Sequence, residues 1–276
     1  MAGELYVVAT PIGNLGDMVP RAVEVLHAVD LIAAEDTRHS GRLLKHLGIE
    51  TPMVAYHDHG EEHQSERIVQ ALEQGQSVAL ISDAGTPLIS DPGYRLVRKA
   101  RQSGVKVTPI PGPCALITAL CASGLPSDRF SFEGFLPAKS GARQKKLSTL
   151  AEDPRTLVFY ESPHRVLETL GDMSDVLGGD REAVLARELT KAFETFLAGS
   201  LEALSQMVAE DANQQRGEIV ILVSGAPEVA VSESEQRRVL GVLMEELPLK
   251  QAAALAAKIT GGQKNALYQL ALSLKA

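Results

Sequence analysis

Short apolar runs alternate with longer amphipathic segments over the first 124 residues of the chain. Continuous apolar runs of this kind are typical of parallel strands that are buried on both faces. The alternation therefore predicts five strands, each followed by a helix, in an open and mostly parallel sheet. The five predicted strands span residues 5–9, 31–34, 53–56, 78–81 and 105–110.

The alternation stops between residues 124 and 137, where Gly, Pro and three Phe residues follow one another closely. We interpret this stretch as the junction to a second α/β domain. In that domain we expect strands near 156–160, 182–187, 193–198 and 218–224, and helices at about 141–151, 164–177 and 200–210.

A second linker, residues 226–234, precedes three predicted helices at about 234–246, 249–259 and 263–274. Their spacing fits a helix-turn-helix, and it equally fits an αα-hairpin that only packs. The predicted fold is therefore α/β, with two α/β domains and a small C-terminal helical module. The predicted boundaries are 1–124, 125–228 and 229–276.

The composition is that of a soluble globular protein, with 45% hydrophobic and 22% charged residues. No apolar run approaches the roughly 18 residues of a membrane span. The first residues lack a basic and apolar signal, so we expect a cytoplasmic protein. Cys114 and Cys121 fall on one apolar helical segment, where they are expected to be buried and not to form a disulfide.

The net charge of −8 argues against a generally basic, nonspecific nucleic-acid binder. Two basic segments without any acidic residue nevertheless stand out, at 134–150 and 247–276. Either one alone is typical of a solvated surface, but two in an acidic chain indicate a polyanionic partner. Their candidate contact residues are Lys139, Arg143, Lys145, Lys146, Lys250, Lys258 and Lys264.

The most informative stretch is residues 82–93, which follows the fourth predicted strand and contains two Asp, two Gly and two Pro. An ordinary loop with a capping Asp is the commoner structure, but these twelve residues exceed the usual two to six. In open α/β sheets, ligands bind at the carboxyl ends of the strands. Asp83 is placed to point inward there, and Gly85 permits close approach of the backbone to a ligand. We expect a small-molecule site.

Other loops on the same edge carry polar groups. Residues 10–17 lack both Lys and the G-x-G-x-x-G pattern, which excludes a dinucleotide fingerprint. Residues 35–40 fit either catalysis or a helix cap with a salt-bridged Arg, and both interpretations stay open. The three His and three acids of 57–63 resemble metal ligands but are more typical of an exposed helix start, so no metal is predicted. Further along, Ser162 and Pro163 predict a helix N-cap and first helical position.

Several of these loops together resemble a known family, the ribosomal RNA small-subunit methyltransferase I group of the tetrapyrrole-methylase superfamily. The resemblance covers nearly the whole chain. It is carried by residues 9–15, 34–38, 82–93, 111–114, 159–162, 186–191, 247–250 and 264–268.

This resemblance implies an S-adenosylmethionine-dependent enzyme that methylates a cytidine 2′-hydroxyl in the decoding region of 16S rRNA. It implies two α/β domains with the cofactor in the cleft between them, a homodimer, and 16S rRNA or the small ribosomal subunit as partner. The superfamily's Gly-Asp-Pro loop falls on residues 85–87, where Thr86 replaces the acid and Asp83 is the possible substitute. The implied cofactor contacts are Pro11, Asp83, Ala84, Gly85, Thr86, Leu88, Ile89, Cys114, Ala115, Tyr160, Glu188, Leu189 and Gly217.

Methyl transfer to a ribose hydroxyl is helped by a positioned base and a nearby cation. From loop position we take Glu35 or Asp36 as base, with Arg38 or Lys191 near the developing alkoxide. Two alternatives remain, namely a tetrapyrrole methylase and a non-catalytic RNA-binding assembly factor.

Overall fold

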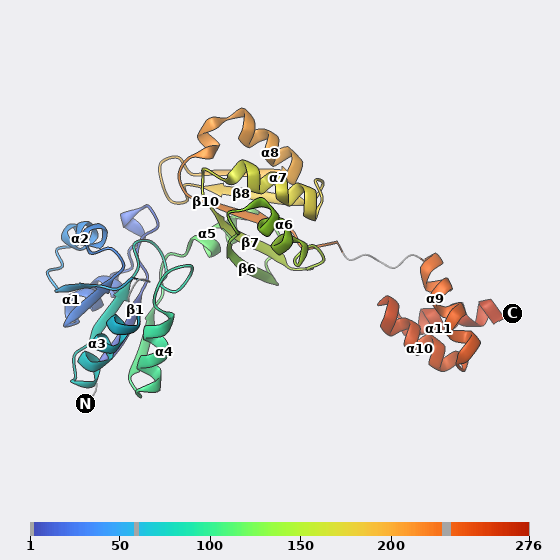
Figure 1. The fold of residues 1–276 in the computed structure, drawn as a ribbon, viewed down its shortest axis with the longest axis horizontal. Helices are drawn as coiled ribbons and strands as arrows, with labels where there is room; N and C mark the ends of the chain where they lie inside the picture. Colours follow the sequence, from blue (N-terminus) through green and yellow to red (C-terminus); the bar gives the residue numbers. More distant parts are fainter. Residues whose placement is uncertain (1–2, 58–60, 228–232, 276) are drawn as a thin grey trace. The chain divides into compact units, whose positions relative to one another are not determined.

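The computed structural model describes residues 3–57, 61–227 and 233–275 (Figure 1). The chain forms two compact units, Met1–Ala226 and Pro227–Ala276. Two five-stranded sheets lie in the first unit. The sheets and their helices confirm the predicted α/β fold class. Within the described ranges, no helix is both long and apolar enough to cross a membrane.

The first sheet is parallel throughout, with strand order β3-β2-β4-β1-β5. Its strands are β1 (Glu4–Val8), β2 (Leu31–Ala34), β3 (Met53–Ala55), β4 (Val78–Ile81) and β5 (Lys106–Ile110). Every residue of β4 is buried, as its continuous apolar sequence predicts. The five strands expected from the alternating pattern are thus confirmed.

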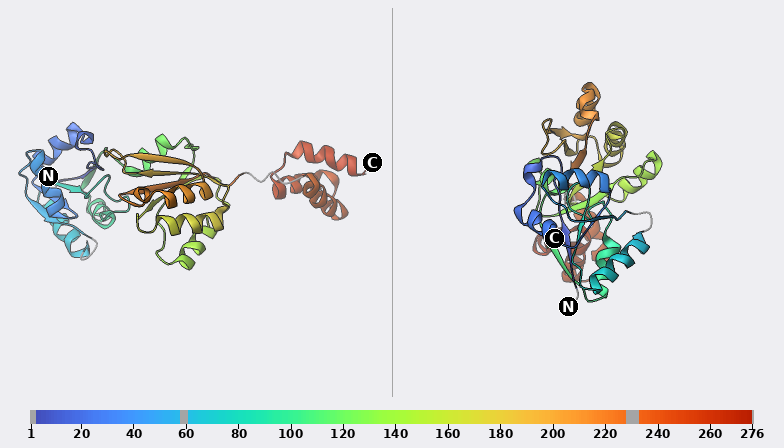
Figure 2. Two further views of the ribbon diagram at one scale, coloured as in Figure 1. Left: turned by 90° about the horizontal axis from the view of Figure 1, so that it is seen from above. Right: turned by 90° about the vertical axis from the view of Figure 1, so that its left-hand side faces the viewer.

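Helices cover both faces of this sheet (Figures 1 and 2). One face is packed by α1 (Pro20–Ala28) and α2 (Thr37–His46), through apolar residues such as Leu26 and Leu44. The other is packed by α3 (Glu61–Glu73) and α4 (Tyr94–Gln102), through Leu72 and Leu96. Since all strands run in one direction, their carboxyl ends and following loops gather at a single edge.

The second sheet is mixed, with order β6-β7-β10-β8-β9, and only β6 and β7 are parallel. Its strands are β6 (Phe130–Phe135), β7 (Thr156–Glu161), β8 (Glu182–Arg187), β9 (Thr195–Ser200) and β10 (Ile219–Val223). One face is packed by α6 (Ser140–Ser148), α7 (Val166–Leu177) and α8 (Leu201–Glu210).

The opposite face of the second sheet is packed by α5 (Ala115–Ser123), which directly follows the last strand of the first sheet. Leu116 and Leu120 of α5 belong to one buried cluster with Val158 and Val220 of the second sheet. Because this helix begins at the ligand edge of the first sheet, its packing places that edge beside the second sheet.

Three sequence interpretations are wrong in detail. Residues 124–137 are not only a junction, because they contain strand β6. The helix after β7 starts at Val166 with Arg165 as N-cap, so Ser162 and Pro163 lie in a preceding turn. The two cysteines are not fully buried: Cys114 is half-buried, and Cys121 is exposed because it lies outside the apolar cluster that α5 forms with the second sheet.

The C-terminal unit, over its described residues 233–275, consists of α9 (Glu233–Glu246), α10 (Leu249–Thr260) and α11 (Lys264–Lys275). Its core is small and rich in alanine, with Leu240 and Leu267 packed against Ala253 and Ala256. Gly261 ends α10 in the left-handed region, at φ 67°. The predicted domain boundaries at 124/125 and 228/229 stay predictions, and residue 228 lies outside the described residues.

Candidate functional site

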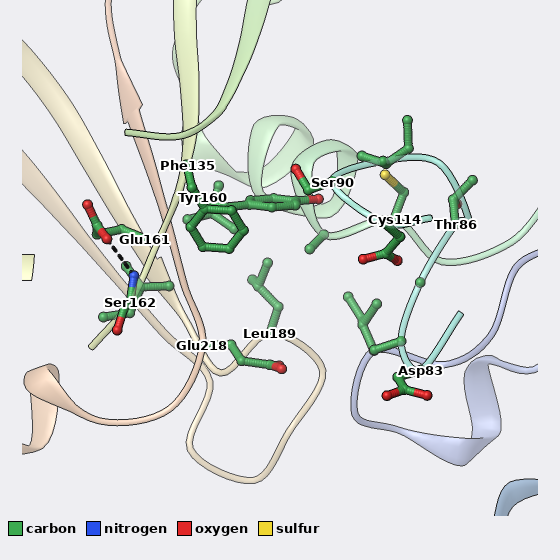
Figure 3. Close-up of a pocket in the computed structure, with 18 of the residues that line it drawn as sticks. Asp83, Thr86, Ser90, Cys114, Phe135, Tyr160, Glu161, Ser162, Leu189 and Glu218 are labelled. Carbon is green, nitrogen blue, oxygen red and sulfur yellow. Dashed lines mark hydrogen bonds between the residues drawn. The ribbon is translucent and has the colours of Figure 1, made fainter. Parts of the chain in front are cut away.

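A cavity of about 420 Å³ lies where the loops after β1, β2, β4 and β5 meet the second sheet (Figure 3). This volume falls within the roughly 300–1,000 Å³ of typical ligand pockets. The lining residues are Ile12, Glu35, Asp83, Ala84, Gly85, Thr86, Ile89, Ser90, Asp91, Cys114, Ala115, Phe135, Tyr160, Glu161, Ser162, Pro163, Leu189, Gly217, Glu218, Ile219 and Val220.

Hydrogen bonds hold loop 82–93 to the loop after β1. The backbone N–H of Thr10 donates to the Gly85 carbonyl at 2.9 Å, and the Gly85 N–H donates to the Thr10 carbonyl at 3.0 Å. The fully buried Thr10 hydroxyl donates to the Ser82 carbonyl at 3.1 Å. Gly85 has φ 84°, a conformation that favours glycine, and a Cβ there would lie 3.2 Å from the Ile12 side chain, which would have to shift slightly.

Backbone strain is concentrated in two loops at the site. Among the described residues, the non-glycine positions with positive φ are Leu88 (73°) and Ser90 (63°) in one loop, and Glu188 (52°) and Thr190 (65°) in the other. Such conformations cost about 1–3 kcal/mol each and persist where the surrounding structure enforces them, often at functional sites. Ser90 itself and Leu189, between the latter two, line the cavity.

A β-bulge directs Phe135 into the cavity. Phe132 pairs with Val158, but the register then shifts, so that Phe135 pairs with Tyr160. Because the shift reverses the alternation, Phe132 and Phe135 lie on the same face as Tyr160. Both rings meet Tyr160 edge-to-face, at centroid distances of 4.8 and 5.7 Å. The Phe135 ring is 56% exposed, and it extends toward the cavity in Figure 3.

Tyr160 joins the second sheet to α5. Its phenol oxygen accepts a hydrogen bond from the Leu116 N–H at 3.2 Å. Burial raises the pKa of Tyr160, so that the phenol stays protonated and neutral through the physiological range. The Tyr160 side chain forms part of the cavity wall.

The cavity is acidic. Five of its lining residues are carboxylic acids, and none of the described lining residues is Lys, Arg or His: the acids are Glu35, Asp83, Asp91, Glu161 and Glu218. Glu161 is buried and accepts hydrogen bonds from the Ser162 N–H at 2.7 Å and the Thr169 hydroxyl at 2.6 Å, so it organises its own loop. Two of these acids have cationic partners outside the lining, since Glu161 lies 3.4 Å from Arg165 and Glu218 lies 2.8 Å from Lys191. Neither partner lines the cavity itself, so the lining still favours a cationic ligand.

The predicted catalytic residues separate in the structure. Glu35 lines the cavity, whereas Asp36 and Arg38 do not. Asp36 is the N-cap of α2, accepting from the Arg38 N–H at 2.8 Å, and this hydrogen bond lowers its pKa. The Arg38 side chain is 90% exposed and lies 3.4 Å from the Asp36 carboxylate. For these two residues, the capping interpretation is the one observed.

Lys191 is also outside the cavity lining. Its ammonium group pairs with Glu188 at 2.7 Å and Glu218 at 2.8 Å. Partial burial opposes its charge, but the two carboxylates hold the pKa of Lys191 above its usual value. Lys191 thus forms ion pairs with two carboxylates, one of which, Glu218, lines the cavity.

Most predicted cofactor residues meet at the cavity. Pro11, Leu88 and Glu188 lie next to lining residues but do not line it themselves. Sequence reasoning missed Ile12, Ser90, Asp91, Phe135, Glu161, Ser162, Pro163, Glu218, Ile219 and Val220. Ser90 and Asp91 belong to loop 82–93 and could have been included on that ground. Phe135 could not have been predicted, because the β-bulge determines which face of the sheet its side chain lies on.

The predicted RNA contacts include one error. Arg143 is 1% exposed and pairs with Asp172 at 2.5 Å, so it cannot reach a phosphate. Lys146 pairs with Glu133 at 2.8 Å. The other predicted lysines are exposed: Lys139, Lys145, Lys250, Lys258 and Lys264.

No group of His, Cys, Asp and Glu able to hold a metal ion occurs among the described residues. The metal-like segment 57–63 includes residues 58–60, which lie outside the described ranges.

Known proteins share this fold and sequence. The family profile described as Tetrapyrrole (Corrin/Porphyrin) Methylases matches residues 4–205, and that described as RsmI C-terminal HTH domain matches 230–275. A cobalt precorrin-4 methyltransferase structure matches with a TM-score of 0.60 and 15% identity, over 80% of this chain and 94% of that one. The profile and the fold together define a protein of the tetrapyrrole methylase class.

Relatives of higher sequence identity show which family within this class the chain belongs to. Proteins named Ribosomal RNA small subunit methyltransferase I are 62% identical in Pseudomonas aeruginosa (98% of this chain, 97% of the relative) and 55% identical in Haemophilus influenzae (99% and 98%). The chain belongs to the ribosomal RNA small subunit methyltransferase I family.

Proposed function

We propose that the protein methylates the ribose 2′-hydroxyl of a cytidine in the decoding region of 16S rRNA, with S-adenosylmethionine as methyl donor. The observation that supports this most is an acidic, partly apolar cavity at loop 82–93 in a chain 62% identical to a relative named as an rRNA methyltransferase. S-adenosylmethionine, when bound, supplies an electrophilic methyl group on a positively charged sulfur.

The residues present fit this cofactor. It carries a sulfonium and an ammonium group, which the carboxylates of Asp83 and Asp91 would attract. Ile12, Leu189 and Ile219 offer apolar walls for a nucleoside. We propose that Asp83, Gly85, Thr86, Cys114, Ala115 and Leu189 form the main cofactor contacts, with the other predicted lining residues around them.

Glu35 is the proposed general base. Of the residues predicted to be catalytic, it alone lines the cavity. A carboxylate there can accept the proton of a ribose hydroxyl that is aligned for in-line displacement, a role that typically contributes about 10²–10⁴-fold in rate. Glu35→Gln should therefore lower kcat by about 100-fold or more while cofactor binding is retained. Asp36→Ala, by contrast, should lower thermal stability through loss of the α2 cap.

A tetrapyrrole substrate has weaker support from the comparisons, because the relatives that are 62% and 55% identical are named as rRNA methyltransferases. The likeness to a precorrin methyltransferase, at 15% identity, concerns the fold alone. A non-catalytic assembly factor would leave the cavity's acidic lining without a ligand.

Labelled-methyl transfer to three acceptors tests these functions against one another. We expect transfer to small ribosomal subunits or free 16S rRNA, and none to a porphyrinogen. A 2′-O-methyl group removes the nucleophile of alkaline cleavage, so the modified linkage should resist base. Label on the porphyrinogen, or an alkali-sensitive labelled nucleotide, would contradict the proposal. Absence of cofactor binding in calorimetry would favour the assembly factor.

The proposal also includes a cytoplasmic location, which an rRNA-modifying activity implies. The family resemblance adds the small ribosomal subunit or its 16S rRNA as partner, and a homodimer. Sedimentation equilibrium of the purified chain tests the last of these.

A further inference from the structure

Helix α2 carries a basic face that lies outside both basic segments noted in the sequence. The helix spans Thr37–His46 and contains no acidic residue. Its basic residues are all exposed: Arg38, His39, Arg42, Lys45 and His46. Helix α4 of the same domain is also basic and contains no acidic residue. What distinguishes α2 is its position relative to the cavity.

Helical geometry places these residues together. At about 100° per residue, all five fall within an arc of about 120°. Ser40 and Leu44 lie on the opposite side of the helix, and each is only 2% exposed. Burial of that side against the first sheet fixes the basic side outward.

The charge of this face is largely uncompensated. Among the described residues, no acidic side chain forms an ion pair with Arg42 or Lys45. Arg38 makes only the 3.4 Å contact with Asp36. Two strong, persistent cations one helical turn apart are thus available to an anionic partner.

The basic face begins at the edge of the cavity. Glu35, two residues before the helix, lines the cavity. The Asp36 N–H donates to the Asp83 carboxylate at 3.1 Å, which ties the start of α2 to loop 82–93. From Arg38 to Lys45 the face extends about 10 Å along the helix axis.

We propose that α2 binds phosphates of the rRNA strand next to the target nucleotide; this rests on the proposed function and adds a substrate surface to it. The cavity's carboxylates repel phosphate, while the neighbouring helix attracts it. This separation of charge orients the strand, with its phosphates on α2 and a ribose at the cavity mouth. Phosphate contacts of this kind position a nucleic acid without reading its sequence.

The test is the double variant R42E/K45E, measured in methyl transfer to small subunits and in filter binding of 16S rRNA. We expect KM for the acceptor to rise about tenfold or more, with kcat and the cofactor Kd unchanged. Each lost phosphate contact should reduce the slope of log affinity against log salt by about 0.7, giving about 1.4 for the pair. The conservative variant R42K/K45R should behave like the wild type.

The matched control is R98E/R101E, which makes the same change of charge on exposed residues of α4, across the sheet. It should leave KM and the salt slope unchanged. An equal effect in both double variants, or none in R42E/K45E, would overturn the proposal. Failure of the proposed function is a separate result, namely a wild type that binds rRNA but transfers no methyl group. The filter-binding comparison still decides the role of α2 in that case.

Discussion

The hydroxyl of Thr86 donates a hydrogen bond to the carbonyl oxygen of Pro113 at 2.9 Å. This bond joins loop 82–93 to the turn that starts α5, and both lie at the cavity. Position 86 is the one at which the superfamily resemblance leads to an acidic residue. In this chain the Thr86 hydroxyl is bonded to a backbone carbonyl, and this hydrogen bond links two loops at the cavity.

Thr86→Val should weaken cofactor binding without unfolding the protein. A typical neutral hydrogen bond contributes about 1 kcal/mol, which corresponds to about fivefold in affinity. Titration calorimetry with S-adenosylmethionine measures the change, and Thr86→Ser, which keeps the hydroxyl, is the control. Equal affinity in Thr86→Val and the wild type would show that the two loops are held by other contacts.

Phe135→Ala should raise KM for the RNA acceptor. The ring is half exposed at the cavity, where a nucleotide base can stack on it, and such stacking contributes about 1–3 kcal/mol per base. We therefore expect KM to rise about fivefold or more, with cofactor affinity unchanged. Phe130→Ala is the matched control, because Phe130 is exposed on the same strand but does not line the cavity. A loss confined to cofactor affinity would assign the ring to the cofactor instead.

Arg143→Met should destabilise the second domain and leave RNA binding intact. Removing one partner of a buried ion pair leaves Asp172 without its counter-charge, at a cost of about 3–5 kcal/mol. Urea unfolding measures this cost, and Arg143→Met combined with Asp172→Leu should recover much of it. A reduced salt slope in rRNA binding, with normal stability, would restore Arg143 as a phosphate contact.

Asp153 should make stability sensitive to acid. Hydrogen bonds from Arg155, including one from its guanidinium at 2.6 Å, lower the pKa of Asp153 from 3.8 to about 2. Because the folded pKa lies below the unfolded one, this pair stabilises the fold above pH about 4 and ceases to do so as pH falls toward 2. The stability difference between the wild type and Asp153→Asn should therefore be constant near neutral pH and shrink below pH about 4. A difference independent of pH in urea unfolding would contradict this.

The sequence predicts the first sheet well because β2, β3 and β4 are short and fully apolar, β1 is apolar after Glu4, and clear turn residues separate the strands. Only the edge strand β5 is mixed, with Lys106 and Thr108 among its five residues. Strand β6 was harder to predict, since the bulge between Phe132 and Gly134 breaks the alternation that identifies a strand. Because of the same bulge, the sequence alone does not predict that the Phe135 side chain points toward the cavity.

The incorrect predictions for individual side chains depend on contacts that the local sequence does not reveal. Arg143 has the sequence context of a surface residue, and its buried partner Asp172 lies 29 positions away. Glu35 and Asp36 are adjacent acids in the same loop, so the sequence gives no reason to prefer one as the cavity residue. In the structure, Asp36 caps α2 and Glu35 lines the cavity. The local sequence pattern thus predicts which loops form the cavity, but it does not predict which of their side chains point into it.

A crystal structure of the protein grown with S-adenosylmethionine is the most direct measurement. We predict the cofactor in the cavity, with its sulfonium and ammonium groups among the carboxylates and its nucleoside against Leu189 and Ile219. An empty cavity at saturating cofactor, or cofactor bound elsewhere on the chain, would contradict the proposed site.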